Sequence, residues 1–153
     1  MSVDVRVVET DAELNACIDL RRSVFVEEQD VPEDRELDGL DGEATHLLAW
    51  DGYPVGTARI RDYGADDDGR RVAKVERVAV EASRRGEGIG RDLMAHAEAF
   101  ATDEGYDRVR LDAQVPVVAF YERLGYTGTS EEFEDAGIPH RTMEKALGGD
   151  RAV

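Results

Sequence analysis

Cysteine, lysine and long apolar runs are all scarce in this chain. Cys17 is the single cysteine, so no internal disulfide can form. No window of about 18 apolar residues occurs, so we expect no transmembrane helix. Residues 1–6 lack a basic segment followed by an apolar run, and no secretion signal is expected. These absences favour a cytoplasmic protein.

Acidic residues outnumber basic ones by 35 to 19, which gives a formal net charge of −16 at pH 7. This excess disfavours a nucleic acid partner, whose phosphates would be repelled, and suits a cationic small partner better. Lys74 and Lys145 are the only lysines. An acidic, lysine-poor surface fits adaptation to high salt, where screening removes the self-repulsion. The alternative is an acidic surface without functional meaning.

A length of 153 residues is typical of one domain and suffices to bury a core. We therefore expect a single domain over residues 1–153, without internal repeats or linkers. The hydrophobic patterns predict an α/β (α+β) fold with the element order β-α-β-β-β-α-β-α-β-β.

The first helix has the clearest start signal. Residues 5–9 form a short candidate strand, and Thr10 and Glu13 then make a T-x-x-E capping box. Apolar residues follow at helical spacing: Leu14, Cys17, Ile18, Val24 and Phe25. Cys17 lies on this apolar stripe, so we interpret it as a core residue and not as a nucleophile. Residues 33–43 are acidic and expected to be irregular.

The remaining elements follow from turns and periodicity. Asp51-Gly52 is a tight-turn pair, and Asp66-Asp67-Asp68-Gly69 is a loop between two strands. We expect strands over 45–50, 55–61, 72–80, 108–113, 126–133 and 140–145, and helices over 88–105 and 116–125.

The strand over 75–80 runs into a glycine-rich segment and then a helix. That segment reads Arg84-Arg85-Gly86-Glu87-Gly88-Ile89-Gly90-Arg91. A helix N-terminus offers backbone N–H groups and partial positive charge, and glycines let a phosphate approach the main chain. The arginines reverse the local charge in an otherwise acidic protein. This pattern favours a diphosphate site.

The glycine spacing does not fit two common nucleotide-binding motifs. A dinucleotide-binding fingerprint needs G-x-G-x-x-G, whereas the spacing here is G-x-G-x-G, and the G-K-[ST] of a Walker loop is absent. The remaining alternative is a glycine-rich turn that only joins a strand to a helix.

The segment Arg85-Gly86-Glu87-Gly88-Ile89-Gly90 matches the R/Q-x-x-G-x-G/A motif of the GNAT superfamily of N-acetyltransferases, which this chain resembles. Further blocks are similar to its ElaA-like branch: Phe25-Val26-Glu27-Glu28-Gln29, Pro32, Asp38, Asp41, Ala113-Gln114, Phe120-Tyr121-Glu122-Arg123-Leu124-Gly125-Tyr126 and Gly137-Ile138-Pro139-His140. The similarity covers about residues 20 to 145. Pro116 departs from the family pattern, so the start of the last helix is expected to differ.

The resemblance implies a mixed, largely antiparallel central sheet with helices on both faces and acetyl-CoA as co-substrate. Backbone groups of Val78 and Val80 would hold the pantetheine arm. The diphosphate would be surrounded by Arg85, Gly86, Gly88, Ile89, Gly90 and Arg91. The strand holding Val78 would carry a bulge and splay from the next parallel strand, with the thioester in the gap and a backbone N–H near its oxygen.

The family reaction is direct attack of an amine on the thioester. Tyr121 matches the tyrosine that protonates the leaving thiolate; the alternative is a packed aromatic ring. Glu76 is a candidate base, although an ordinary glutamate is too acidic for direct transfer; otherwise it pairs with an arginine. His140 has a better intrinsic pKa, or it is structural. His46 is interpreted as structural, and we expect no metal.

An acidic wall at the end of the first helix and in the loop after it would attract the amine acceptor, a small molecule or a peptide. It comprises Glu28, Glu36, Asp38 and Asp41. The alternative is a solvated acidic loop. Two functions fit: an N-acetyltransferase, or a non-catalytic acyl-CoA sensor that regulates a partner. The acceptor, acyl length and oligomeric state stay open, with a homodimer as one alternative.

Overall fold

The computed structural model describes residues 3–148, which form two compact units. The first unit holds residues 3–61 and 77–97, and the second holds 62–76 and 98–148. Three elements run from one unit into the other: β3 (Pro54–Ala65), β4 (Arg71–Val80) and α3 (Ile89–Asp103). The single domain expected from the sequence stays a prediction.

The first unit begins with a strand and a long helix. Its further elements are β1 (Asp4–Val7), α1 (Asp11–Arg21), the π-helix η1 (Arg22–Glu28), α2 (Glu33–Glu36), the 3-10 turn η2 (Asp41–Glu43), β2 (Thr45–Trp50) and the 3-10 turn η3 (Ala82–Arg84). The strand order in this unit is β1-β2-β3-β4, and both β1 with β2 and β2 with β3 pair antiparallel.

The predicted capping box starts α1. The Thr10 hydroxyl accepts a hydrogen bond from the backbone N–H of Glu13 at 3.1 Å, and the Glu13 carboxylate accepts one from the backbone N–H of Thr10 at 3.2 Å. Cys17 is fully buried, as expected for a core residue, and burial raises the pKa of its thiol. The helical path continues through η1 to Glu28.

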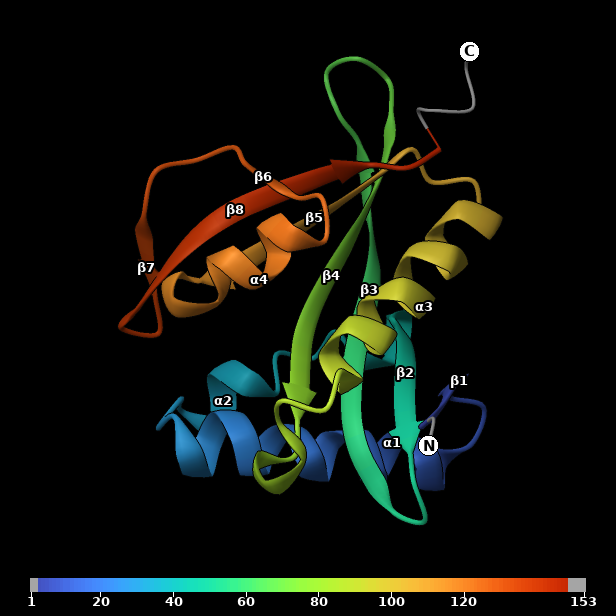
Figure 1. Cartoon of the computed structure of the whole chain (residues 1–153), viewed down its shortest axis with the longest axis vertical. Coiled ribbons are helices and arrows are strands. Elements are labelled where there is room, and N and C mark those ends of the chain that lie inside the picture. Colours follow the sequence, from blue (N-terminus) through green and yellow to red (C-terminus); the bar gives the residue numbers. More distant parts are fainter. Residues whose placement is uncertain (1–2, 149–153) are drawn as a thin grey trace. The chain divides into compact units, whose positions relative to one another are not determined.

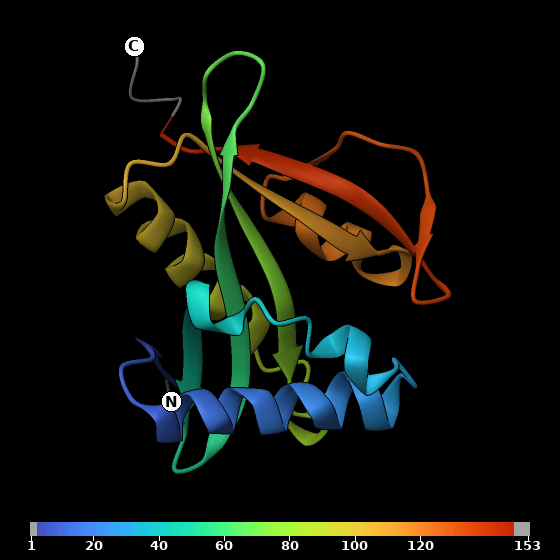
Figure 2. The ribbon, with the colours of Figure 1, turned by 180° about the vertical axis from the view of Figure 1, so that it is seen from behind.

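Helices cover both faces of the sheet in the first unit. Figures 1 and 2 show α1 on one face of β2 and β3, and the first turns of α3 on the other. The core between them is aliphatic and includes Leu47, Leu48, Ala49, Val55, Ile89 and Leu93. This arrangement fixes the start of α3 against the sheet.

The second unit contains the first part of β4, up to Glu76, together with the elements that follow α3. Its further elements are β5 (Arg108–Gln114), the 3-10 turn η4 (Val115–Val117), α4 (Val118–Arg123), β6 (Thr127–Gly128), β7 (Phe133–Asp135) and β8 (Ile138–Ala146). β5 pairs parallel with β4, and β8 pairs antiparallel with β5, β6 and β7. The predicted mixed, largely antiparallel sheet is confirmed.

Three local expectations need correction. The single strand expected over 126–133 is two short strands, β6 and β7. Between them the Ser130 hydroxyl accepts a hydrogen bond from the backbone N–H of Thr142 at 3.0 Å, so a side chain binds β8 there. The region 33–43 is not wholly irregular, since it contains α2 and η2. Pro116 lies in η4 and not in the last helix, which begins at Val118.

Candidate functional site

The join between β4 and α3 depends on two left-handed glycines. Gly86 has a φ of 82° and Gly88 a φ of 88°, a conformation that side-chain-bearing residues rarely adopt. A Cβ on Gly88 would also lie 3.2 Å from the Arg91 guanidinium. The loop therefore requires glycine at these two positions; the motif named Gly88, whereas Gly86 stands at one of its variable positions.

Another glycine, in β3, lets the helix start close to the sheet. A Cβ on Gly56 would lie 2.9 Å from Cγ2 of Ile89 and 3.0 Å from Cδ1 of Leu93, so a side chain there would push α3 away. The backbone N–H of Glu81 donates to the Val55 carbonyl at 2.9 Å and ties the loop entrance to the same strand. The N-terminus of α3 is thus held in a fixed place.

The arginines of the loop differ in what they bind. Arg85 makes two bonds of 2.6 and 2.8 Å to the Glu28 carboxylate, which raise the pKa of Arg85 and lower that of Glu28. Arg84 is paired with Asp51 at 2.7 Å. Arg91 is exposed and has no ion-pair partner among residues 3–148. The local positive charge that the sequence indicated is therefore partly neutralised by the chain itself.

β4 changes its backbone geometry just before the residues expected to hold the pantetheine arm. Arg77 has a φ of 56°, a conformation that a regular strand does not contain. Val78 and Val80, which follow it, are half-buried. Within the second unit the register of β4 with β5 ends at Lys74 opposite Arg110. The irregular backbone thus lies where the bulge was expected, and the bulge itself and the gap beside it stay predictions.

Tyr121 lies in α4 of the second unit and is 7% exposed. Its ring stands edge-on to Phe120 and Tyr126, with centroids 5.0 and 5.8 Å away. Burial raises the pKa of Tyr121 to about 12. The phenol is therefore protonated at neutral pH, as a proton donor must be.

The two candidate bases also belong to the second unit. His140 is opposite Gln114 in the β5–β8 register; its Nδ1 lies 2.7 Å from the Ile138 carbonyl and its ring stacks on Phe133. Glu76 is half-buried in β4, next to Arg77 of the first unit. Their catalytic roles stay predictions. His46, by contrast, is buried with Nε2 3.0 Å from the Asp41 carbonyl, and burial lowers its pKa, which fits the structural role expected for it.

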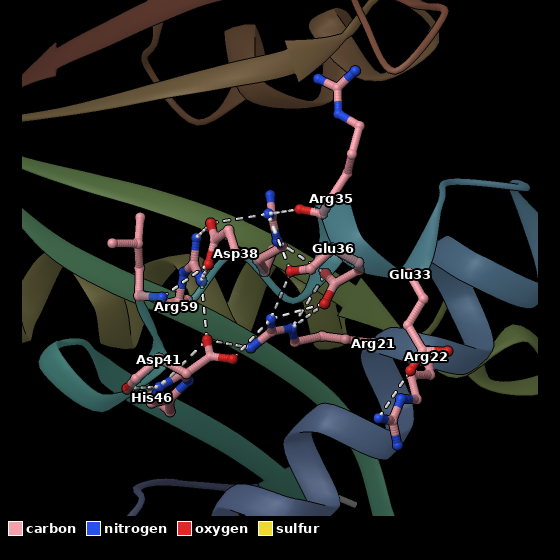
Figure 3. A network of polar contacts seen from close by, with 11 residues as sticks. Arg21, Arg22, Glu33, Arg35, Glu36, Asp38, Asp41, His46 and Arg59 are labelled. Atoms are coloured by element: carbon pink, nitrogen blue, oxygen red, sulfur yellow. Dashed lines mark hydrogen bonds and ion pairs between the residues drawn. The ribbon is translucent and has the colours of Figure 1, made fainter.

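The acidic wall is bound to arginines of its own unit (Figure 3). Glu36 pairs with Arg21 at 2.8 Å, and the side chains of both are 1% exposed. Asp41 pairs with Arg21 at 2.8 Å and with Arg59 at 2.9 Å. Asp38 binds Arg59 and Arg77. Three carboxylates are thus paired with three arginines. We call these six residues the buried ion network: Arg21, Glu36, Asp38, Asp41, Arg59 and Arg77.

The ion pairs dominate the ionisation of the network. Burial acts to raise the pKa of Asp38, but hydrogen bonds from Arg59 and from the backbone N–H of Leu40, with the charges of Arg59 and Arg77, hold it well below its ordinary value. Burial acts to lower the pKa of Arg21, and bonds to Glu36 and Asp41 raise it instead. Asp38 and Arg21 are therefore both charged at neutral pH.

Sequence reasoning named the acidic members of this network but missed the basic ones. A signal was present in Arg59, which stands among residues of β3 that are all buried, from Val55 to Ile60. A charged residue inside such a run is almost never buried without a partner. A role of Glu28, Glu36, Asp38 and Asp41 in acceptor binding stays a prediction, although Glu36 has almost no surface to offer.

Comparison with known proteins agrees with this geometry. The family described as Acetyltransferase (GNAT) domain matches residues 13–147. The uncharacterized N-acetyltransferase YjcF of Bacillus subtilis is 40% identical over 141 residues, 91% of this chain and 96% of its own. Protein ElaA of Escherichia coli is 35% identical over 138 residues, 89% of each chain.

Solved structures are similar over nearly the whole chain. The crystal structure of E. coli ElaA has a TM-score of 0.81 at 31% identity, covering 94% of this chain and 99% of that one. An acyl-CoA N-acyltransferase from Pseudomonas aeruginosa has a TM-score of 0.82 at 35% identity, covering 95% and 100%.

The chain therefore belongs to the GNAT family and is an acyltransferase. Within that family it is an ElaA-like N-acetyltransferase, as the sequence motifs implied.

Residues 3–148 contain neither a membrane-spanning helix nor a metal-binding cluster. No helix in this range has the length and apolar character needed to cross a membrane. In the same range no three His, Cys, Asp or Glu side chains lie together as a metal site would need.

Proposed function

We propose that this acyltransferase moves an acetyl group from acetyl-CoA to an amine of a small molecule or peptide. The observation that carries the proposal is the loop between β4 and α3, where Gly86 and Gly88 hold left-handed conformations at a helix N-terminus. A diphosphate there would receive backbone N–H groups and the charge of Arg91. Arg85 would have to share its guanidinium with Glu28 or release it.

The chemistry assigned to the second unit divides between an acid and a base. Tyr121 would protonate the thiolate of coenzyme A. An alkyl amine is mostly protonated at pH 7, and making it neutral costs about 4.6 kcal/mol, so a base at Glu76 or His140 would assist.

Val78 and Val80 would hold the pantetheine arm through their backbone groups. Glu28 and Asp38, each with part of its side chain exposed, are the acidic residues best placed to attract a cationic amine.

The test of this function is thiol release from acetyl-CoA in the presence of an amine panel. We expect thiol to appear faster with at least one amine than with acetyl-CoA alone, and acetyl-amine to form in equal amount. Tight acetyl-CoA binding without amine-dependent thiol release would contradict the proposed reaction. Release without binding of acetyl-CoA to the glycine loop would contradict the proposed site.

Gly88→Val should weaken acetyl-CoA binding at least tenfold, or about 1.4 kcal/mol. Valine cannot easily adopt the φ of 88°, and its side chain would meet Arg91 and cover the loop amides. Calorimetric titration measures the affinity, and circular dichroism checks the fold. Gly52→Val is the matched control, since Gly52 has a φ of 76° in the β2–β3 turn with nothing within 4 Å of an added Cβ. Unchanged affinity in a folded Gly88→Val protein would overturn the assignment.

The acidic surface is proposed to be an adaptation to salt, so molar KCl should raise the melting temperature. With 35 acidic and 19 basic residues, the chain carries an excess of 16 negative charges. Screening over about 3 Å at 1 M salt removes their repulsion, while the buried ion network is screened little. Thermal melts in low and molar KCl measure the effect. A flat or falling melting temperature would instead support an acidic surface without that meaning.

A cytoplasmic location and a homodimer also stay predictions. The single cysteine, Cys17, is buried and offers no disulfide partner within the chain. Cell fractionation tests the location, and sedimentation at several concentrations tests the dimer.

A further inference from the structure

A charged residue occupies the strained position of β4. Among the described residues, Asp30, Arg77 and Ala136 are the non-glycine residues with positive φ, and Arg77 alone lies inside a strand. Such a conformation is unfavourable for a residue with a Cβ and persists only where its surroundings impose it. Glycine would adopt it without strain, so the presence of arginine requires an explanation.

The guanidinium of Arg77 is held at several points. It forms an ion pair with Glu36 at 2.9 Å and a hydrogen bond to Asp38 at 3.2 Å. It also donates to the backbone carbonyls of Arg35 and Glu36 at 3.2 and 3.3 Å. These contacts fix the side chain, and through it the backbone from which it extends.

The groups that hold Arg77 are themselves fixed. Arg21 binds Glu36 through two nitrogens, and Arg59 binds Asp38 through two. Glu36 has 1% of its side chain exposed. Figure 3 shows these side chains converging on the loop that follows α2. Arg77 is thus held by Glu36, a buried carboxylate that is itself paired with Arg21, and by Asp38, which is paired with Arg59.

We infer that Arg77 is a positioning residue, whose anchored side chain imposes the irregular backbone in β4 and thereby aims the backbone groups of Val78 at the acyl-CoA. In a regular strand, successive peptide groups point to opposite edges of the sheet. A left-handed residue breaks this alternation, so the peptide groups on either side of residue 77 are redirected. The inference rests on the proposed function only where it names acyl-CoA as the molecule that the redirected groups meet.

The test compares Arg77→Gly with Arg77→Ala. Both changes delete the same ion pairs, but glycine tolerates positive φ and alanine does not. We expect Arg77→Ala to lower acetyl-CoA affinity about tenfold and Arg77→Gly to stay within about threefold of the parent protein. Arg22→Ala is the control, since it removes an exposed ion pair with Glu33. Equal losses in the alanine and glycine variants would overturn the inference.

A second readout does not depend on binding. In nuclear magnetic resonance spectra without ligand, the backbone amide signals of Val78 and Ala79 should move in Arg77→Ala and return toward the parent positions in Arg77→Gly. If the parent protein fails to bind acetyl-CoA, the proposed function is wrong, and these signals still decide whether Arg77 sets the backbone. Signals that move equally in both variants would refute that.

Should Arg77→Ala fail to fold, Asp38→Asn tests the anchor from the other side, with Arg77 itself left in place. It keeps the shape of the side chain and removes the charge that faces both Arg77 and Arg59. We expect the signals of Val78 and Ala79 to move in the same direction as in Arg77→Ala, but less. Unmoved signals at both residues would contradict the anchoring role.

Discussion

Replacing Tyr121 with phenylalanine should lower kcat by roughly 10² or more, the usual range for losing a general acid, while acetyl-CoA affinity stays within about threefold. Phenylalanine keeps the ring and its edge-on contacts with Phe120 and Tyr126, but it removes the proton that the phenol can donate. The loss should appear equally in kcat and kcat/KM, because the interaction exists only in the transition state.

The burial of Tyr121 makes proton transfer from its phenol to the thiolate more costly. A phenol with a pKa of about 12 gives its proton to a thiolate of pKa about 8.5 at a cost of about 5 kcal/mol. The transfer becomes easier if the thiolate is desolvated too, since burial also raises a thiol's pKa. The phenol stays protonated up to about pH 12, so its ionisation should produce no fall in kcat between pH 8 and 10.

Tyr126→Phe is the matched control for this experiment. Tyr126 is also buried, and the substitution also removes a hydroxyl group. That hydroxyl donates a hydrogen bond to Glu98 at 2.8 Å and has no proposed role in the reaction. We expect its kcat within about threefold of the parent. Wild-type turnover by Tyr121→Phe with the best amine would show that another group protonates the sulfur. Joint loss of acetyl-CoA affinity and melting temperature would show that Tyr121 is a packing residue.

Local signals in the sequence were sufficient for most of the fold. The capping box at Thr10 and Glu13, the turn at Asp51-Gly52 and the glycines between β4 and α3 each depend on neighbours within a few residues. Such short-range constraints are visible in the residue order alone. The error at 126–133 arose because the polar residue Ser130 makes its contact with Thr142, which lies in another strand.

The candidate site was predictable only in its short-range part. The glycine loop is continuous in sequence and was found by its motif. The buried ion network joins Arg21, Glu36, Arg59 and Arg77, which lie on four separate elements and meet only after folding. Acidic residues in a loop after a helix suggest an exposed surface, and apart from Arg59 nothing local shows that distant arginines neutralise them.

Glu36→Ala should lower the free energy of unfolding by about 3–5 kcal/mol, because it leaves the buried charge of Arg21 short of a partner. That is a large part of the 5–15 kcal/mol typical of a folded domain. Urea denaturation measures it, with the midpoint expected to fall and the slope to stay unchanged. Loss of the ion pair to Arg77 adds to the effect.

Glu33→Ala is the control, since it makes the same change in the same helix, α2. Its partner is Arg22 at 3.2 Å, and the two side chains are 59% and 42% exposed, so the loss should be within about 1 kcal/mol. The pair of variants also separates structure from acceptor binding. Suppose that Glu36→Ala raised KM for the amine and had the same urea midpoint as Glu33→Ala. Glu36 would then be an acceptor-binding residue, and the stabilising role of the network would be refuted. If Glu36→Ala unfolds much earlier, with KM for the amine unchanged at a temperature where it remains folded, Glu36 supports the fold and the acceptor is attracted by residues with more exposed surface.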